Sequence, residues 1–443
     1  MSEATPKRVL VLGAGLVTRP LVEYLLNVPE FTLTVATRTV SKAERMIGDH
    51  PRGKAVTLNV EDDASLRELV SGADLVISLV PYAYHVKVAK LCIEMKRQMV
   101  TTSYVSPEMR ALDGAAKEAG VCVLNEIGLD PGIDHMSAMK IIHEVENAGG
   151  TVAGFTSNCG GLPAPEANTN PWGYKFSWSP RGVVLAARNA ARYLWEGQLR
   201  EVPGPELFGD VKPATVKGLG DFEIYPNRDS MGYKEIYGLD ATRTLFRGTF
   251  RNLGHCATWK ALADLGWLDL EERDVAGRTF GAFFAELIGS QGDLKADLAA
   301  KLGVDAGADP IRRMEWLGLL GDDPVPGERK SPLDVLAERL LAMLPYEKDE
   351  RDMIILQHTF LAEYPEGRKE RIVSTLVDYG IPGGDSSMAR TVSLPAAIAT
   401  RMILQGEIAT TGVHVPVIPE IYEPVLAELA TLGIAFEDER EAL

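Results

Sequence analysis

The chain has 443 residues, of which 46% are hydrophobic and 24% are charged, and its formal net charge is −16. This length exceeds the roughly 250–300 residues that one hydrophobic core serves, so we expect two or three domains. The chain carries 62 Asp and Glu against 46 Lys and Arg. This balance argues against a nucleic-acid partner, because phosphate binding needs clustered cations.

No apolar run in the sequence is long enough to span a membrane, and the N-terminus leads into the first predicted strand without the apolar segment of a signal peptide. Four cysteines are widely spaced and form none of the short motifs typical of metal sites or redox pairs: Cys92, Cys122, Cys159 and Cys256. We therefore expect a cytoplasmic protein with reduced cysteines, no membrane contact and no metal.

Between residues 8 and 150, short apolar runs alternate with helical stretches, which is typical of βαβ units and a parallel sheet. The near-continuous apolar character of the runs indicates a sheet that helices cover on both faces. The predicted strands are Val9–Leu12, Leu33–Ala36, Ala55–Leu58, Leu75–Leu79, Met99–Thr101 and Val121–Leu124. The fold class of this part is therefore α/β, with a doubly wound parallel sheet of the Rossmann type.

After residue 160 the alternation stops, and loops rich in Gly, Pro and aromatic residues precede mostly helical segments such as Cys256–Leu265. Two β-rich runs, Asp352–Leu361 and Arg371–Val377, flank the turn Pro365–Gly367, which predicts an antiparallel hairpin. Helices are predicted near Ser387–Gln405 and Glu420–Leu432. This second region thus has an architecture of its own.

The first predicted strand runs directly into the loop Gly13–Ala14–Gly15–Leu16–Val17–Thr18, which a helix follows. In a dinucleotide-binding loop, two glycines allow a tight turn and let the backbone approach the pyrophosphate at the helix N-terminus. Thr18 replaces the third glycine of that motif, so we expect the helix and the strand to pack slightly further apart. An ordinary tight turn is the alternative interpretation.

Ala36, Thr37 and Arg38 end the second predicted strand, where NAD-specific enzymes usually carry Asp or Glu. An Arg with flanking hydroxyl groups suits a ribose 2′-phosphate, so we predict NADP(H) as the cofactor, with a solvated surface Arg as the alternative. Asn59 and Val60, and then Val80, follow the third and fourth strands, where such folds place the adenine and nicotinamide-ribose loops.

Further segments carry more Gly, Pro, aromatic and charged residues than packing requires. They are Thr102–Pro107, Gly128–His135, Cys159–Glu166, Tyr174–Pro180, Tyr225–Ser230 and Arg247–Arg251. In this order they closely resemble the saccharopine dehydrogenases of the NADP-linked, glutamate-forming type, also called saccharopine reductases. The runs GLDPGIDHM, GGLPAPE and YKFSWSP are the most specific, and the resemblance covers nearly the whole chain.

The resemblance implies a Rossmann domain, a second α+β domain and a small helical domain. The NADP-binding Rossmann domain would comprise residues 1–130, with the segment of about 385–443 packed nearby. The α+β domain, for substrate binding and dimerisation, would comprise residues 131–255 and 346–384, and the helical domain residues 256–345. A cytoplasmic homodimer is expected.

The implied reaction joins L-glutamate to α-aminoadipate semialdehyde and reduces the imine with NADPH to saccharopine, reversibly, in the aminoadipate route of lysine biosynthesis. The positions expected to bind the cofactor are Gly13, Ala14, Gly15, Leu16, Val17, Ala36, Thr37, Arg38, Asn59, Val60, Val80, Leu129, Asp130, Pro131 and Ser179. Those expected to bind the substrate are Ser103, Tyr104, Arg228, Thr249, Phe250 and Arg251. Phe250 stands where an aliphatic residue is expected, and Asn59 where Asp is usual.

This chemistry suits the residues present. Saccharopine carries three carboxylates, and Arg is the preferred partner because its planar fork binds a carboxylate at two points. Arg247 and Lys175 add to the expected cations. Imine reduction needs hydride transfer and proton shuttling but no metal or covalent nucleophile. Asp130, His135 and Tyr104 are the candidate catalytic residues, whereas a structural role is expected for His143.

Three alternatives stay open at this point. The same reaction could run oxidatively in lysine degradation, although the chain shows no fused lysine-ketoglutarate reductase half. A carboxynorspermidine dehydrogenase-like imine reductase would need fewer carboxylate partners. A regulatory protein that senses the NADP(H) ratio would need no pocket for a substrate with several carboxylates.

Overall fold

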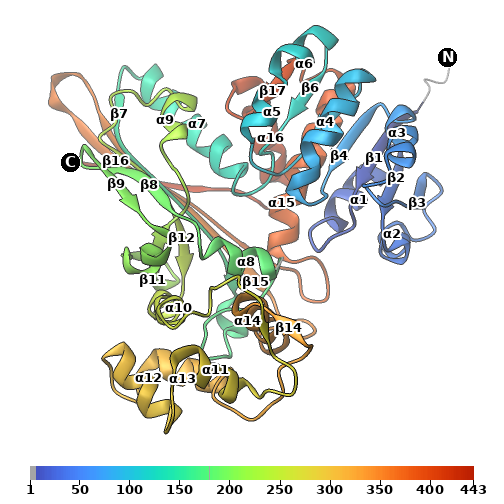
Figure 1. The fold of residues 1–443 in the computed structure, drawn as a ribbon. Coiled ribbons are helices and arrows are strands. Elements are labelled where there is room, and N and C mark those ends of the chain that lie inside the picture. Colours follow the sequence, from blue (N-terminus) through green and yellow to red (C-terminus); the bar gives the residue numbers. More distant parts are fainter. Residues whose placement is uncertain (1–5, 179) are drawn as a thin grey trace, which may run out of the picture. The chain divides into compact units, whose positions relative to one another are not determined.

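The computed structural model describes residues 6–178 and 180–443, which fall into two compact units (Figure 1). Unit 1 comprises Met1–Gly150 and Gly380–Glu437, and unit 2 comprises Thr151–Tyr379 and Asp438–Leu443. The expected boundary at residue 130 lies inside unit 1, and the segment expected to form a helical domain, residues 256–345, lies inside unit 2. The three-part division stays a prediction.

Unit 1 is built on a parallel sheet of seven strands in the order β17-β6-β5-β4-β1-β2-β3. The strands are β1 (Lys7–Leu12), β2 (Phe31–Thr37), β3 (Gly53–Thr57), β4 (Leu75–Ser78), β5 (Gln98–Val100), β6 (Cys122–Leu124) and β17 (Gly412–His414). The six predicted strands and the doubly wound α/β fold are confirmed. The C-terminal part of the chain adds β17 beside β6.

The helices of unit 1 form two packed groups, as expected for a sheet covered on both faces. One group contains α1 (Arg19–Leu26), α2 (Val40–Ile47), α7 (Ile133–Asn147), α15 (Ser387–Gln405) and α16 (Pro419–Thr431). The other contains α3 (Asp63–Ser71), α4 (His85–Glu94), α5 (Pro107–Arg110) and α6 (Asp113–Ala119). A short 3₁₀ helix, η1 (Tyr82–Tyr84), precedes α4. The order of the strands reverses between β1 and β4: β2 and β3 lie on one side of β1, and β4, β5 and β6 lie on the other. Folds of this kind bind their ligands at such a point, beside the carboxyl ends of the strands.

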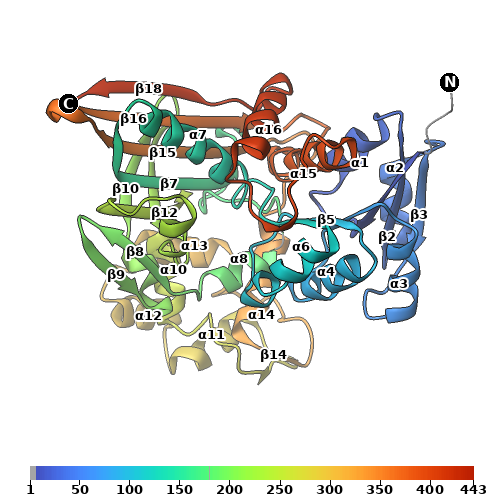
Figure 2. The ribbon, with the colours of Figure 1, turned by 90° about the horizontal axis from the view of Figure 1, so that it is seen from above.

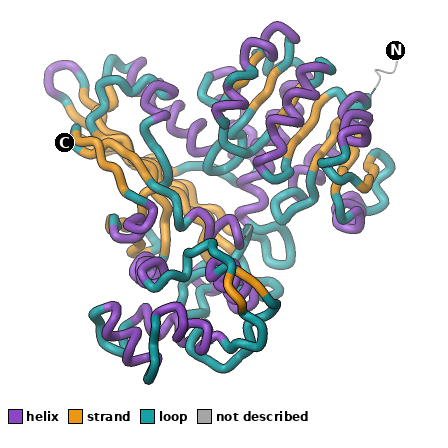
Figure 3. Tube along the Cα trace, viewed as in Figure 1, coloured by secondary structure: helices purple, strands orange, loops and turns teal. Residues whose placement is uncertain are grey.

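Unit 2 is built on a mixed sheet of nine strands, whose long members are conspicuous in Figure 3. Its main path runs β10-β11-β12-β7-β15-β16-β18, and β8 pairs with β12 and β9. The strands are β7 (Thr151–Pro163), β8 (Ala191–Trp195), β9 (Gln198–Val202), β10 (Lys212–Val216), β11 (Gly220–Pro226), β12 (Thr244–Arg251), β15 (Asp352–Glu363), β16 (Lys369–Tyr379) and β18 (Glu437–Ala442). The predicted hairpin is confirmed as β15 and β16, joined by η4 (Pro365–Gly367), and β18 runs along β16 (Figure 2).

One continuous apolar core joins this sheet to the helical part of unit 2. Phe250 on the sheet belongs to the same cluster as Trp267, Phe283 and Leu336 from the helical part. The helices are α8 (Pro180–Ala186), α9 (Gly232–Ile236), α10 (His255–Asp264), α11 (Phe280–Ile288), α12 (Leu294–Leu302), α13 (Asp309–Trp316) and α14 (Pro332–Met343); η2 (Pro165–Ala167), η3 (Gly204–Gly209) and the strand pair β13 (Arg273–Asp274) and β14 (Arg329–Lys330) complete the unit. The helical segment and the sheet of unit 2 therefore share one hydrophobic core.

Glycine is required at one point of β7, where the strand packs closely against Phe250. A Cβ atom on Gly160 would lie 2.6 Å from the Cβ of Phe250 and 2.7 Å from its carbonyl oxygen. Both atoms belong to a residue with no exposed surface, so neither can move aside cheaply. Gly154, on the same strand, is different, because its Cβ would make ordinary contacts at 3.6 Å.

These two glycines give a matched pair of variants. Gly160→Ala should destabilise the protein by about 1–3 kcal/mol through overpacking. Gly154→Ala should be neutral or stabilise it by about 0.4–1 kcal/mol, because it reduces the entropy of the unfolded chain. Thermal denaturation followed by circular dichroism measures both. Equal melting temperatures for the two variants would contradict the close packing of Gly160 on Phe250.

Candidate functional site

The loop after β1 meets the requirements of a dinucleotide-binding turn. Gly13 has φ of 110°, and a Cβ there would lie 2.7 Å from the carbonyl oxygen of Leu79, so only glycine fits. The Oγ1 of buried Thr18 accepts a hydrogen bond from the Gly15 N–H at 3.0 Å. Thr18 therefore braces the loop from within, at the position where the motif has its third glycine. Leu16, 68% exposed, lies at the surface of the loop.

The residues expected near the 2′-phosphate lie near a half-buried tyrosine, Tyr84. The Tyr84 hydroxyl donates to Oε1 of Glu61 at 2.7 Å, and this bond raises the pKa of Tyr84, while the nearby Arg38 guanidinium opposes the shift. Arg38 itself is exposed and forms no ion pair with a carboxylate of the described chain. The Asn59 side chain accepts from the Glu61 N–H at 3.2 Å. An available guanidinium thus stands beside the ends of β2 and β3.

The other expected cofactor residues of unit 1 also follow the carboxyl ends of its strands. The carbonyl oxygen of Val60 accepts from Nζ of Lys87 at 2.8 Å, and Val80 follows β4. Leu129 and Pro131 are buried in the turn before α7. Ser179, the remaining position, lies outside the described residues.

Two candidate catalytic side chains contact each other at the same edge of the sheet. The Tyr104 hydroxyl, in the loop after β5, donates to Oδ1 of Asp130, in the loop after β6, at 2.9 Å. Both residues are half-buried. In the first turn of α7, Oδ1 of Asp134 accepts from the Gly132 N–H at 2.6 Å and from the His135 N–H at 2.8 Å. A pair that can orient and carry a proton is therefore present.

The third candidate, His135, has no exposed surface. Its Nε2 lies 2.8 Å from Oε2 of Glu126, and the other carboxylate oxygen of Glu126 accepts from the Val105 N–H at 2.8 Å. Glu126 adopts φ of 56°, a conformation unfavourable for residues other than glycine, so the surrounding contacts must hold it. In this arrangement His135 and Glu126 fix the loop that carries Tyr104.

A buried histidine that the sequence analysis did not single out lies beside this loop. His85 begins α4, and its two ring nitrogens each lie 2.8 Å from a hydroxyl oxygen, Nδ1 from Ser78 and Nε2 from Ser103. Burial lowers the pKa of His85 to about 4. The sequence offered no motif for it, because the contact depends on the lateral pairing of β4 with β5.

The expected substrate residues of unit 2 lie on and beside β12. Because side chains alternate along a strand, Thr249 and Arg251 project from one face and Phe250 from the other. Phe250 is fully buried in the apolar core, so its side chain offers no surface to a ligand. Arg228 is exposed, with φ of 56°, in the turn after β11.

Arg251 is a buried cation without a carboxylate partner among the described residues. Its guanidinium lies 5.2 Å above the ring of Tyr174 and 5.5 Å above that of Tyr225, and donates to the Tyr225 hydroxyl at 3.3 Å. Its Nε makes no hydrogen bond within the described chain. A buried charge without a counter-ion is costly, so this site favours a bound anion. Lys175 differs, because Glu350 already neutralises it at 2.6 Å.

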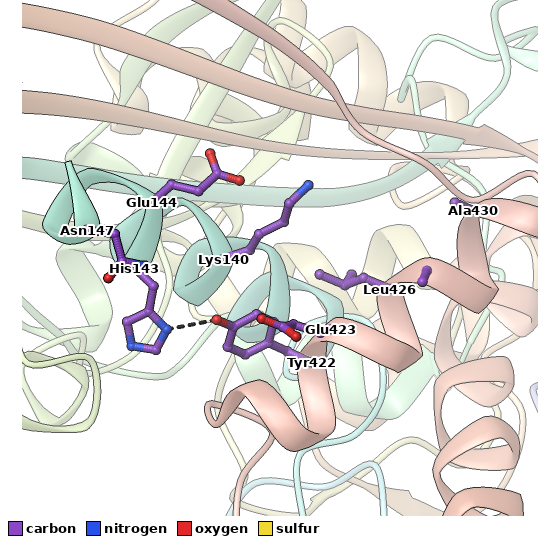
Figure 4. A pocket seen from close by; sticks show the side chains of 9 residues that line it. Lys140, His143, Glu144, Asn147, Tyr422, Glu423, Leu426 and Ala430 are labelled. Carbon is purple, nitrogen blue, oxygen red and sulfur yellow. Dashed lines mark hydrogen bonds between the residues drawn. The ribbon is translucent and has the colours of Figure 1, made fainter. Parts of the chain in front are cut away.

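A separate hollow in unit 1 lies between α7 and α16, with a volume of about 440 Å³ (Figure 4). The Tyr422 hydroxyl lies 2.8 Å from Nδ1 of His143 beside it, which is the structural role expected for that histidine. Lys140, Glu144 and Glu423 give the lining mixed charge. None of the expected site residues lines this hollow.

No cluster of three or more His, Cys, Asp or Glu among residues 6–178 and 180–443 is arranged to hold a metal ion. The four cysteines are buried. In the described part of the chain, no helix combines the length and apolar character needed to cross a bilayer.

Two family models together match nearly the whole chain. Residues 9–124 match the saccharopine dehydrogenase NADP binding domain, and residues 128–434 match the saccharopine dehydrogenase C-terminal domain. The first part of the chain is thus an NADP-binding domain. The boundary between the two matches falls between β6 and α7.

Individual relatives agree with these matches. The chain is 43% identical to the saccharopine dehydrogenase [NADP(+), L-glutamate-forming] of Schizosaccharomyces pombe, over 97% of this chain and 98% of that protein. It is 39% identical to the mitochondrial alpha-aminoadipic semialdehyde synthase of Bos taurus, of which it covers 48%. The solved structure of apo saccharopine dehydrogenase (L-Glu forming) from Saccharomyces cerevisiae superposes with a TM-score of 0.90 at 40% identity, covering 98% of this chain and 100% of that one. The chain therefore belongs to the saccharopine dehydrogenase family.

Proposed function

We propose that this chain catalyses the reversible, NADP(H)-dependent formation of saccharopine from L-glutamate and α-aminoadipate semialdehyde. The observation that carries this proposal is the 43% identity, over 97% of the chain, to a protein named for that reaction. The phosphate-binding loop of unit 1, its Tyr104–Asp130 pair and the uncompensated Arg251 of unit 2 suit the chemistry of the reaction.

A direct assay tests this proposal. Purified protein given saccharopine and NADP+ should produce NADPH, visible by its absorbance, and the reverse mixture of L-glutamate, semialdehyde and NADPH should consume it. A protein that only senses the NADP(H) ratio would bind the cofactor without turnover. Cofactor binding without reaction in either direction would overturn the proposal.

The residues present fit an NADP(H) molecule. The loop from Gly13 to Val17 would hold the pyrophosphate. Gly13 lies so close to the Leu79 carbonyl group that no side chain fits there, so the loop can offer its bare backbone to the phosphates. Thr37 and Arg38 would hold the 2′-phosphate. The remaining positions proposed for the cofactor are Ala36, Asn59, Val60, Val80, Leu129, Asp130, Pro131 and Ser179. Bound NADP(H) would supply a hydride to the imine carbon or accept it in the reverse direction.

Arg38→Ala tests the choice of cofactor. Hydrogen bonds to charged groups contribute about 1.5–3 kcal/mol, so this variant should bind NADPH roughly 10- to 150-fold more weakly. NADH has no 2′-phosphate and serves as the internal control, so its dissociation constant should barely change. Isothermal titration of the variant with both cofactors measures this. Equal losses for the two would show that Arg38 acts on the fold of the loop and not on the phosphate.

We assign the proton transfer to Asp130, with Tyr104 as the residue that orients it. A secondary amine can lose hydride from its α-carbon only after its nitrogen has lost a proton, because the lone pair forms the iminium. The Asp130 carboxylate, held by the Tyr104 hydroxyl at 2.9 Å, would accept that proton and return it during reduction. His135, fully buried beside Glu126, would hold the loop.

Three variants separate these roles. For the wild type, kcat/KM of saccharopine oxidation should rise with pH through one ionisation. Asp130→Asn should lower kcat by about 10²- to 10⁴-fold and remove that ionisation. Tyr104→Phe should lower kcat/KM roughly tenfold and keep the pH dependence, because only one hydrogen bond is lost. Initial rates from about pH 5 to about pH 10 are the measurement.

His135→Asn is the control for that series. It should lower the melting temperature and leave the shape of the pH profile unchanged. If His135→Asn removes the ionisation and Asp130→Asn keeps it, the histidine is the base and the assignment to Asp130 is wrong.

The positions proposed to contact the substrate are Ser103, Tyr104, Arg228, Thr249, Phe250 and Arg251. The Arg251 guanidinium has no carboxylate partner among the described residues, and this supports a substrate carboxylate contact, because a bound anion would compensate its charge. For Phe250, whose side chain is fully buried, only the backbone could take part.

We also propose reduction towards saccharopine, in lysine biosynthesis, as the physiological direction. The support is the greater identity to fungal proteins of matching length, 43% and 42%, than to the longer bovine protein at 39%. A cytoplasmic homodimer is proposed on the family resemblance alone.

A further inference from the structure

His85 joins two hydroxyl groups inside unit 1. The imidazole is 4% exposed, and its Nδ1 and Nε2 each lie 2.8 Å from an oxygen, Ser78 Oγ and Ser103 Oγ respectively. Ser78 ends β4, and Ser103 follows the neighbouring strand β5. The ring therefore bridges the carboxyl ends of two adjacent strands, next to the point where the strand order reverses.

The imidazole is neutral when the enzyme works. Burial lowers the pKa of His85 to about 4, so both ring nitrogens carry hydrogens only in acid. A neutral imidazole donates from one nitrogen and accepts at the other. The ring of His85 therefore accepts a hydrogen bond from one of the two serines, Ser78 or Ser103, and donates to the other.

Ser78 decides that direction. It is fully buried, and within the described chain its hydroxyl has a single hydrogen-bond partner, Nδ1 of His85. A buried hydroxyl hydrogen without an acceptor is costly, so Ser78 must donate to Nδ1. The ring hydrogen then lies on Nε2, which donates to Ser103 Oγ. The opposite tautomer would leave the Ser78 hydrogen without an acceptor.

Ser103 is thereby left with its own hydrogen to donate. Its N–H donates to Thr101 Oγ1 at 3.4 Å and its carbonyl oxygen accepts from the Glu126 N–H at 3.2 Å, so the backbone is held in place. The side chain is half-buried, and in the described residues its hydroxyl contacts only His85. A fixed hydroxyl donor of this kind suits a carboxylate oxygen.

We propose that His85 is a positioning residue: through Nε2 it fixes the Ser103 hydroxyl as a hydrogen-bond donor to a carboxylate of the substrate. This inference rests on the proposed function, in which Ser103 contacts saccharopine. The assignment differs from a general structural role, because it requires one tautomer and requires His85 to act through Ser103.

Kinetics of five variants test the proposal. Ser103→Ala and His85→Leu should each raise the KM for saccharopine roughly tenfold, with the NADPH dissociation constant unchanged. The double variant should lose no more than Ser103→Ala alone, since both remove the same contact. His85→Gln, whose amide N–H can still donate to Ser103, should recover most of the wild-type KM. His143→Leu removes a histidine bonded to a hydroxyl elsewhere in unit 1 and should keep the wild-type KM.

A spectroscopic measurement keeps the proposal testable if His85→Leu fails to fold. In ¹⁵N-labelled wild-type protein, the ring nitrogens of His85 should show the Nε2–H tautomer at neutral pH, and the Nδ1–H tautomer would overturn the proposal. Additive losses in the double variant, or a wild-type KM for His85→Leu, would also overturn it.

A wild-type KM for Ser103→Ala would refute the placement of Ser103 at the substrate, and hence the inference. Absence of saccharopine turnover in the wild type would refute the proposed function itself.

Discussion

The arrangement of unit 1 depends on the contact between the backbone of Gly13 and the carbonyl group of Leu79. Strands β1 and β4 are neighbours in the sheet although the chain makes two further strands between them, so the loops that follow them meet at its carboxyl edge. At that point a Cβ on Gly13 would lie 2.7 Å from the Leu79 oxygen. The turn therefore presents bare backbone, which is what a pyrophosphate needs.

The same lateral order of strands assembles the polar groups beside that turn. β4, β5 and β6 are consecutive in the sheet, and hydrogen bonds join residues at and after their carboxyl ends: Ser78 to His85, His85 to Ser103, and Tyr104 to Asp130. Glu126 contacts both His135 and the backbone of Val105, and so ties α7 to the loop after β5. Ser78, His85, Glu126 and His135 are buried, and buried polar groups are stable only when paired, so these hydrogen bonds hold the loops in place.

Unit 2, in contrast, contains a buried cation, Arg251, that has no carboxylate partner in the described chain. Most of its cations are already neutralised, as Lys175 is by Glu350, whereas Arg251 is surrounded by aromatic rings and its Nε has no partner in the described chain. In a chain of net charge −16, an anionic substrate must be held by such a local cation against the overall field. Arg251 thus supports the proposed binding of a substrate carboxylate.

The sequence by itself determined the strands and turns of unit 1, the hairpin of unit 2 and the cofactor loop. These features depend on short-range patterns: apolar runs, glycines at a strand end and a Pro–Glu–Gly turn. Only the tertiary structure showed that His135 is buried against Glu126, that Lys175 is paired, that Phe250 points into the core and that His85 lies between two serines. The reason is that burial and pairing are set by which strands become neighbours, and residues such as Lys175 and Glu350 meet across 175 positions of the chain.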